Sequence, residues 1–436
     1  MKNKSTQKEI KIKTSFDGKN LTNFSGVLVA KKFMEKLGVG NLFNKIGIKL
    51  HHNIKYETSQ ILSSLVLGIM SGLNRISKIE MFTRDPLIQE ILDIDDKLDA
   101  DTISNRIKRF GMEQNSQLMD GIGELSNKVH KKLGTKSDIL DMDSTVHTVF
   151  GNQEGAEKGY NPEKKGAKSY HPLLGFLDST KECILSWLRP GNSYTSNNAA
   201  GFIKQAFAIL PKSINKLLVR ADSGFFQDEL IRVIESRANT TYLIKVKLKN
   251  LHSLLSGQKW FSIPKMPEWE MTEFMHKSSG WQKARKFVSL RKLVKVEKVN
   301  RLFAVKYYDY FCYVTNIYES PLMIHSLYGD RSTSENWIEA VKRQMFAGSM
   351  MTHDFWANEA LWQMSVLAYN ISVWVRKLSD EATWREEPAT FRSWFIQLAG
   401  KVVRSGRRLY LKMYSAYYYK ERWRKIENAV DDLVFG

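Results

Sequence analysis

Cysteine is almost absent from this chain of 436 residues, in which only Cys183 and Cys312 occur. Both lie in apolar, strand-like runs without metal-ligand spacing, so a disulfide framework and a zinc cluster are disfavoured. Long apolar runs are lacking as well. The longest one, residues 355–375, contains Asn358 and Glu359. We therefore expect a buried helix there and no membrane span.

Acidic residues are scarce relative to basic ones. The chain has 66 Lys and Arg against 46 Asp and Glu, a net charge of +20 and a pI of about 9.6. Such an excess indicates a polyanionic partner, most commonly nucleic acid, although an unspecialised basic protein has the same balance. Residues 1–13 are polar and lysine-rich, so we expect no secretory signal. The predicted location is the cytoplasm, in association with the nucleoid.

The length predicts more than one domain, and the composition is globular. Residues 25–130 show helical periodicity, which suits either a DNA-binding or dimerisation module or plain helical packing. From residue 138 the order β-β-β-α-β-α-β predicts a mixed sheet with helices against it. The predicted division is a helical domain over 1–130, a core over 131–246, a β-rich insertion over 247–327, the rest of the core over 328–380 and a separate tail over 381–436.

Three aspartates lie at predicted strand positions. Asp141 and Asp143 share one face of a short strand, where aspartate is disfavoured and a metal site would explain it. We favour Asp143, at the strand's exit, and Asp141 could share a metal; the alternative is that either one only caps the strand. Asp222 ends the apolar strand 217–221, where ligands gather in α/β sheets, or it caps the following helix.

A fourth acid belongs to the run Tyr328-Gly-Asp-Arg331-Ser-Thr-Ser-Glu335, which Lys342 follows seven residues later. Helical spacing places Arg331, Glu335 and Lys342 on one side of a helix and its first turn. The carboxylate could ligate a cation while the bases hold phosphates. A salt-bridged surface helix is the plain alternative.

Asp143, Asp222 and Glu335 together would suit two Mg²⁺ ions, because magnesium prefers carboxylate and phosphate oxygens. Mn²⁺ can replace magnesium in such a site. His147 and His171 are isolated, and we expect each to be structural or to contact phosphate.

These motifs resemble the signatures of bacterial insertion-sequence DDE transposases that carry the YREK motif. The resemblance covers about residues 138–378, and flanking motifs are similar to the group-one DDE branch. The segments that carry it are Asp143-Ser-Thr, Arg220-Ala-Asp222-Ser-Gly, Tyr328-x-x-Arg331-x-x-x-Glu335 with Lys342, Gly159-Tyr-Asn-Pro162, Tyr170-His-Pro172 and Arg189-Pro-Gly-Asn192.

The resemblance implies an α/β fold with an RNase H-like mixed sheet flanked by helices, interrupted by the β-rich insertion and preceded by the helical domain. It also implies cut-and-paste transposition, with cleavage at the element's ends, a hairpin intermediate and strand transfer into target DNA. Asp143, Asp222 and Glu335 would be the catalytic metal ligands. Tyr328, Arg331 and Lys342 would grip phosphates near the scissile bond, around a flipped base.

Other segments suit DNA contact. Trp269 and Trp281 are candidates to stack on a flipped base, with Trp260 a weaker one, although each could simply pack a small β core. Basic residues that would position the duplex through its phosphates are Lys164, Lys165 and Lys168, the run 283–298, and Arg404, Arg407 and Arg408.

The leading hypothesis is thus a magnesium-dependent DNA transposase that acts as a homodimer, because two transposon ends must be brought together. A structure-specific nuclease on the same core is an alternative, and a strand-transfer assay would separate the two. An inactive, transposase-derived DNA-binding protein is a third reading, which the intact acidic triad disfavours.

Overall fold

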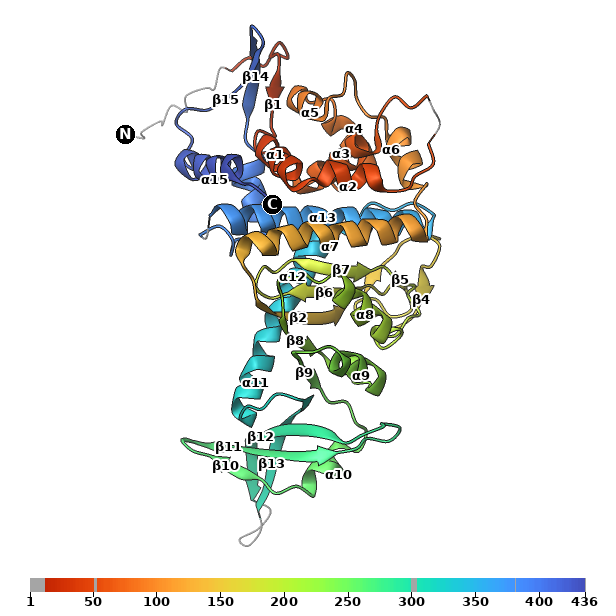
Figure 1. Ribbon diagram of the computed structural model, residues 1–436, viewed down its shortest axis with the longest axis vertical. Helices are drawn as coiled ribbons and strands as arrows, with labels where there is room; N and C mark the ends of the chain where they lie inside the picture. The colour runs from red at the N-terminus through yellow and green to blue at the C-terminus, as the bar shows by residue number, and fades with distance from the viewer. Residues whose placement is uncertain (1–11, 51–52, 299–303, 381, 436) are drawn as a thin grey trace, which may run out of the picture.

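The structure is a computed structural model that describes residues 12–50, 53–298, 304–380 and 382–435. It is elongated, with a helical body at one end, the sheet in the middle and β-rich strands at the other end (Figure 1). The helical body contains α1 (Val27–Leu37), α2 (Val39–Lys45), α3 (Thr58–Met70), α4 (Ile76–Phe82), α5 (Pro86–Leu92), α6 (Ala100–Ile107) and the long α7 (Met112–Leu133).

Local sequence sets the ends of these helices. Gly38 adopts φ +90°, a left-handed conformation that suits glycine, and it separates α1 from α2. Asp85 accepts hydrogen bonds from the backbone at the start of α5, where Pro86 occupies the first helical position.

The C-terminal segment is part of this helical body. Strand β1 (Leu21–Thr22) pairs with β14 (Gly400–Ser405), which pairs with β15 (Arg408–Met413). The last helix, α15 (Lys420–Asp432), packs on α1, and Lys32 Nζ lies 3.0 Å from Asp431 Oδ1. The sequence suggested a separate tail, but pairing with the first strand joins it to the N-terminal helices.

Within the described residues, nine strands form one mixed sheet in the order β10-β11-β12-β13-β9-β8-β2-β6-β7. The core strands are β2 (Ser137–Ser144), β6 (Leu173–Leu177), β7 (Cys183–Trp187), β8 (Lys216–Ala221) and β9 (Thr240–Lys245). Strand β2 is parallel to β8 and antiparallel to β6. With α8 (Ala199–Ile209) and α9 (Asp228–Ser236) against it, this arrangement confirms the predicted α/β class and its RNase H-like mixed sheet (Figure 1).

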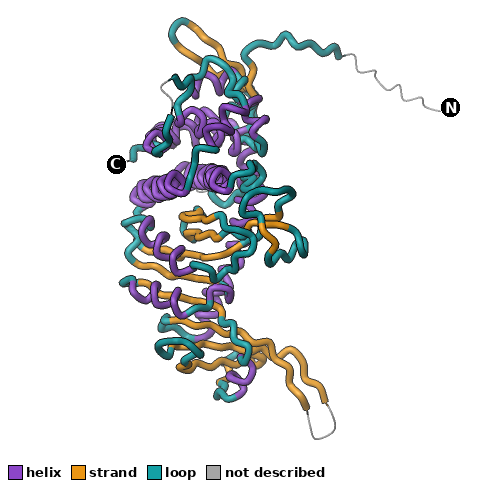
Figure 2. The backbone as a smooth tube through the Cα atoms, turned by 90° about the vertical axis from the view of Figure 1, so that its right-hand side faces the viewer, coloured by secondary structure: helices purple, strands orange, loops and turns teal. Residues whose placement is uncertain are grey.

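The β-rich segment continues the core sheet. Strand β13 (Ala304–Thr315) pairs with β9, and β12 (Arg285–Lys298) pairs with β13. Strands β10 (Phe261–Ile263) and β11 (Met266–His276) complete the edge, and α10 (Leu251–Ser256) precedes them. The β12–β13 ribbon extends past its neighbours (Figure 2).

Helix α13 (Phe355–Ser379) lies beside α7, and these two long helices separate the shorter helices α1–α6 from the sheet (Figure 1). A buried polar residue in the middle of α13 is satisfied internally, because the Asn370 amide bonds both the N–H and the C=O of Cys183, at 2.9 and 2.8 Å. The predicted buried helix is thus confirmed. Across the described ranges, no helix is both long and apolar enough to cross a membrane.

Candidate active site

Two of the candidate acids, Asp143 and Asp222, lie side by side at the carboxyl ends of two central strands of the sheet. Strands β2 and β8 run parallel, with Met142 opposite Ala221. Asp143 and Asp222 are the next residue on each strand, so both lie at the carboxyl ends of adjacent strands, which are about 4.8 Å apart. The sequence predicted both positions, and the register of the two strands brings them together.

Asp143 is largely buried, with 14% of its side chain exposed. Burial raises the pKa of its carboxyl to about 6; the Arg331 guanidinium opposes this shift and the charge of Asp222 adds to it. Its Oδ1 accepts a hydrogen bond from the Ser144 N–H at 2.8 Å, and its Oδ2 lies 2.8 Å from Arg331 Nη2. Two carboxylates this close repel each other, and such a pair favours a bound cation.

Asp222 does cap the turn that follows it, as the plain alternative proposed. Its Oδ1 accepts a hydrogen bond from the Gly224 N–H at 2.9 Å, at the start of a 3₁₀ turn over Ser223–Phe225. The cap uses Oδ1, and Oδ2 can still ligate a cation. The capping and metal-binding roles are therefore compatible.

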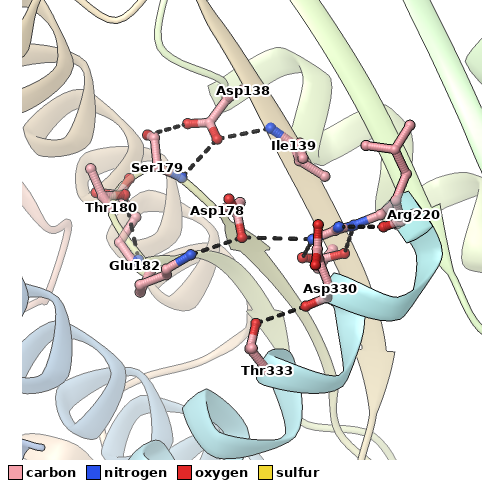
Figure 3. Close-up of polar contacts among 12 residues, drawn as sticks. Asp138, Ile139, Asp178, Ser179, Thr180, Glu182, Arg220, Asp330 and Thr333 are labelled. Carbon is pink, nitrogen blue, oxygen red and sulfur yellow. Dashed lines mark hydrogen bonds and ion pairs between the residues drawn. The ribbon is translucent and has the colours of Figure 1, made fainter. Parts of the chain in front are cut away.

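Asp141 pairs with an arginine, whereas the sequence suggested that it could share a metal ion. Arg220 Nε and Nη2 bind its two oxygens at 2.8 and 2.7 Å, and both side chains are at most 1% exposed. Arg220 Nη1 also donates to the Leu327 carbonyl at 2.8 Å, and Nη2 lies 3.6 Å from Asp178 Oδ1 (Figure 3). This bidentate pair satisfies the Asp141 carboxylate and ties together the strands that carry Asp143 and Asp222.

Arg220 is a positioning residue. From the sequence alone it stands out only as a member of the motif that contains Asp222. Its bond to Leu327 fixes α11 (Pro321–Gly329), the helix that carries Tyr328. An arginine one position before the last residue of a buried strand was the available signal, because a fully buried guanidinium requires an acidic partner.

Arg331 and Lys342 both contact the end of β2. Besides Asp143, Arg331 Nη2 donates to the Met142 carbonyl at 3.0 Å. Lys342 Nζ donates to Thr145 Oγ1 at 3.0 Å and to the Val146 carbonyl at 2.8 Å. The two cations therefore lie on either side of Asp143 in β2, whereas their spacing predicted only that they share one side of a helix with Glu335.

The Tyr328 ring lies 4.8 Å from the Tyr313 ring. Burial raises the pKa of the Tyr328 hydroxyl to about 12, and the nearby Asp222 and Asp143 charges add to this effect, which Arg331 opposes. The hydroxyl therefore stays protonated and can donate a hydrogen bond.

Glu335 is placed differently from the aspartates. The helix it occupies is interrupted, with a 3₁₀ turn over Asp330–Thr333, α12 (Ser334–Glu339) and a π-helical turn over Ala340–Gln344. Glu335 is exposed in the first turn of α12. Among the residues that the structure describes, no three His, Cys, Asp or Glu side chains are grouped to hold a metal ion. Convergence of Glu335 with Asp143 and Asp222 stays a prediction.

The tryptophan candidates lie in aromatic clusters. Trp281 is 8% exposed, 4.9 Å from the Phe226 ring and under the Arg285 guanidinium at 4.7 Å. Trp269 stacks on Phe311 at 5.7 Å. These contacts agree with the alternative interpretation, in which the two tryptophans pack a small β core.

The weaker candidate, Trp260, lies under the Arg291 guanidinium at 4.4 Å.

Most of the basic candidates lie at the surface, but Arg285 in the run 283–298 is buried and pairs with Asp228 at 2.6 Å. Lys164 and Lys165 are exposed in the loop before β5 (Lys168–Tyr170), and Lys168 Nζ donates to Asn152 Oδ1 at 3.1 Å. Far from this loop, Arg404 in β14 pairs with Glu90 at 2.7 Å. Arg407 and Arg408 are exposed at the turn between β14 and β15.

The two candidate histidines, His147 and His171, are held in the neutral form. Burial lowers the pKa of His147 to about 4, with a further contribution from Lys342, and burial also lowers the pKa of His171. A neutral imidazole adds no charge for a phosphate, so a structural role suits both.

Comparison with known proteins gives the family. The sequence matches the family described as "Transposase DDE domain group 1" over residues 4–434. Among solved structures, the piggyBac transposase synaptic complex with hairpin DNA aligns over 94% of this chain and 85% of that chain, with 12% identity and a TM-score of 0.45. The Mos1 transposase paired-end complex with left transposon end aligns over 45% of this chain and 60% of that chain, with 12% identity and a TM-score of 0.18.

A comparison with curated proteins gave no match. At these scores the structural likenesses add nothing to the assignment, which follows from the sequence match over almost the whole chain. The protein belongs to the family of transposase DDE domains, group 1, and is a DDE transposase, an enzyme that acts on DNA with divalent metal ions.

Proposed function

We propose that the protein cuts DNA at the ends of an insertion sequence and joins those ends to target DNA, using Asp143, Asp222 and Glu335 as the ligands of two Mg²⁺ ions. The observation that carries this proposal is the pairing of two carboxylates at adjacent strand ends, where the pKa of Asp143 is raised to about 6. Oxygen donors of this kind fit magnesium, and Mn²⁺ would fit as well. Bound there, the ions would supply Lewis-acid stabilisation of the attacking and leaving oxygens.

Glu335 is the third ligand in this proposal because of its position relative to Arg331. It follows Arg331 by four residues, about one helical turn, and Arg331 contacts Asp143 directly. The exposed Glu335 carboxylate would have to turn toward the aspartates to complete the site.

The chain's own cations would hold the substrate. Within the described residues, Arg331 Nε is buried and has no hydrogen-bond partner, which suits a phosphate oxygen beside Asp143. Lys342 and the protonated Tyr328 hydroxyl would hold neighbouring phosphates. Such contacts orient the scissile bond without reading sequence.

We propose further that second-strand cleavage passes through a hairpin at the transposon end and that a homodimer holds two ends together. The solved piggyBac complex is described as a synaptic complex with hairpin DNA. The net charge of +20 supports DNA as the partner, and association with the nucleoid would follow from it. Lys164, Lys165, Lys168, Trp269 and Trp281 remain proposed DNA contacts.

The experiment is to incubate the protein with the inverted repeats that flank its gene and with Mg²⁺, and to map nicks and hairpins on a denaturing gel. Asp143→Asn, Asp222→Asn and Glu335→Gln should each abolish cleavage and leave DNA binding largely intact. Asp330→Asn is the matched control, because Asp330 is an exposed acid of the same segment.

Two results would overturn the proposal. Metal-dependent cleavage by the Asp222 or Glu335 variant would remove that residue from the site. Pre-cut ends that the enzyme fails to join to a target would identify a nuclease and not a transposase.

A further inference from the structure

A cavity of about 500 Å³ lies beside the end of β2, and it is lined by two of the proposed DNA contacts, Lys164 and Lys342, together with an aromatic ring that has no role in the proposal above. Its lining includes Val146, His147, Phe150, Lys164 and Lys342. The first of these residues follows Asp143 by three positions, which places the cavity within roughly 10 Å of Asp143 along the chain. A ligand in it would therefore lie close to the reacting phosphate.

Phe150 gives this cavity an unusual wall. It lies in the loop between β3 (His147–Thr148) and β4 (Glu157–Lys158), and 78% of it is exposed. The Lys164 ammonium lies 4.8 Å from the centre of its ring. A free aromatic face beside a cation is the arrangement on which nucleobases stack in single-strand binding sites. Trp281, in contrast, is already covered by protein side chains.

Positive charge lies next to this aromatic wall. Lys342 Nζ uses two of its three donors on Thr145 and Val146, so one N–H remains for a phosphate. Lys164 adds a second ammonium at the rim. Glu163 opposes them, with its Oε1 3.9 Å from Lys342 Nζ and a side chain that is 59% exposed. His147, which is neutral, also lines the cavity.

We infer that this cavity binds one unstacked nucleobase and its adjoining phosphate from the DNA that the enzyme processes, with the base on Phe150 and the phosphate between Lys342 and Lys164. The inference rests on the proposed function, because only a DNA substrate held at Asp143 brings a nucleotide to this position. Phe150 is then a positioning residue for the strand that is cut.

The test uses ultraviolet crosslinking of a single-stranded oligothymidylate that contains 5-iododeoxyuridine, which reacts with aromatic rings stacked on the base. We expect the crosslinked peptide to contain Phe150. Phe150→Ala should abolish this crosslink and weaken binding of the oligonucleotide by about 5- to 150-fold, the range that loss of one base–aromatic stack gives. Phe150→Trp should retain the crosslink, because it restores a stacking surface.

The matched control is Tyr318→Ala. Tyr318 is 95% exposed and lies 6.0 Å from the Lys286 ammonium, but it lines a different cavity. This variant should crosslink and bind as the wild type does. Glu163→Gln should strengthen binding, because it removes the charge that opposes the phosphate.

Crosslinks that map elsewhere, or equal binding by the Phe150→Ala and wild-type proteins, would overturn the inference. Cleavage of the flanking repeats is measured in parallel with Mg²⁺. A wild-type protein that cuts DNA but does not crosslink at Phe150 would refute the cavity alone. One that crosslinks at Phe150 but neither cuts nor joins DNA would refute the proposed function alone.

Discussion

The buried ion pair of Asp141 and Arg220 permits a quantitative prediction. Arg220→Met keeps a long side chain but removes the charge, and it leaves Asp141 without a counter-ion at a position that is 0% exposed. Removing one partner of a buried pair costs about 3–5 kcal/mol, because the remaining charge stays desolvated. We expect a loss of this size in the free energy of unfolding.

This loss converts into a melting temperature. The entropy of unfolding near the transition is about 2.1 cal/mol/K per residue, so 436 residues that unfold together give about 0.9 kcal/mol/K and a decrease of roughly 3–6 °C. A core that melts as a separate unit would shift further, because fewer residues share the transition. Differential scanning calorimetry measures both the shift and the number of transitions.

The double variant Asp141→Leu with Arg220→Met tests the reasoning. Replacing both members of a buried pair by apolar side chains is often close to neutral, so most of the lost stability should return. Arg232→Met is the control: Arg232 pairs with Asp228 at 3.0 Å but is 44% exposed, and its loss should leave the melting temperature almost unchanged. A double variant as unstable as Arg220→Met, or a single variant that melts with the wild type, would refute the assigned role of the pair.

Further predictions concern the site and the core. A proton competes with a cation for Asp143, because the pKa of this carboxyl is raised to about 6. The apparent affinity for Mg²⁺ should therefore weaken about tenfold per pH unit below pH 6 and level off above it. Isothermal titration calorimetry should record proton release on Mg²⁺ binding at about pH 5 and almost none at about pH 8, and equal release at both pH values would contradict this. Lys342→Ala should slow end cleavage far more than it weakens DNA binding, and a variant that cuts at the wild-type rate in a single-turnover assay would remove the phosphate role. Burial raises the pKa of Glu359 from its ordinary 4.5 to about 7, so the protonated form is favoured in the folded state and stability falls as pH rises through that window, by about 3 kcal/mol. The difference in unfolding free energy between wild type and Glu359→Gln should change by that amount between pH 4 and pH 8, and a constant difference would show that the carboxyl does not titrate there.

Much of this fold could be predicted from periodicity and spacing. The strands that end in Asp143 and Asp222 are recognisable because an acid directly after an apolar strand is unusual, and the strand order then brings the two together. The pairing of Asp141 with Arg220 could not be predicted, since it depends on the register of two strands that are far apart in the sequence.

Two other features also lay beyond sequence patterns. The interruption of the helix around Glu335 by a 3₁₀ turn and a π-helical turn changes the rotation per residue, so simple helical spacing does not fix where its carboxylate points. The sequence gives no signal at Phe150, because an isolated phenylalanine usually belongs to a core. The exposure of its ring is visible only in the structure.

The joining of the two chain ends has a consequence for synthesis of the protein. The N–H groups of Ser25 and Gly26 bind the carbonyls of Leu398 and Ile396, so the first helices have part of their hydrogen-bonding only after the last tenth of the chain exists. At about 5–20 residues per second, a ribosome needs roughly 15–60 s to pass from the end of α7 to α15. During that interval the growing polypeptide exposes apolar helix faces to chaperones and proteases, and a prematurely terminated product would never bury them.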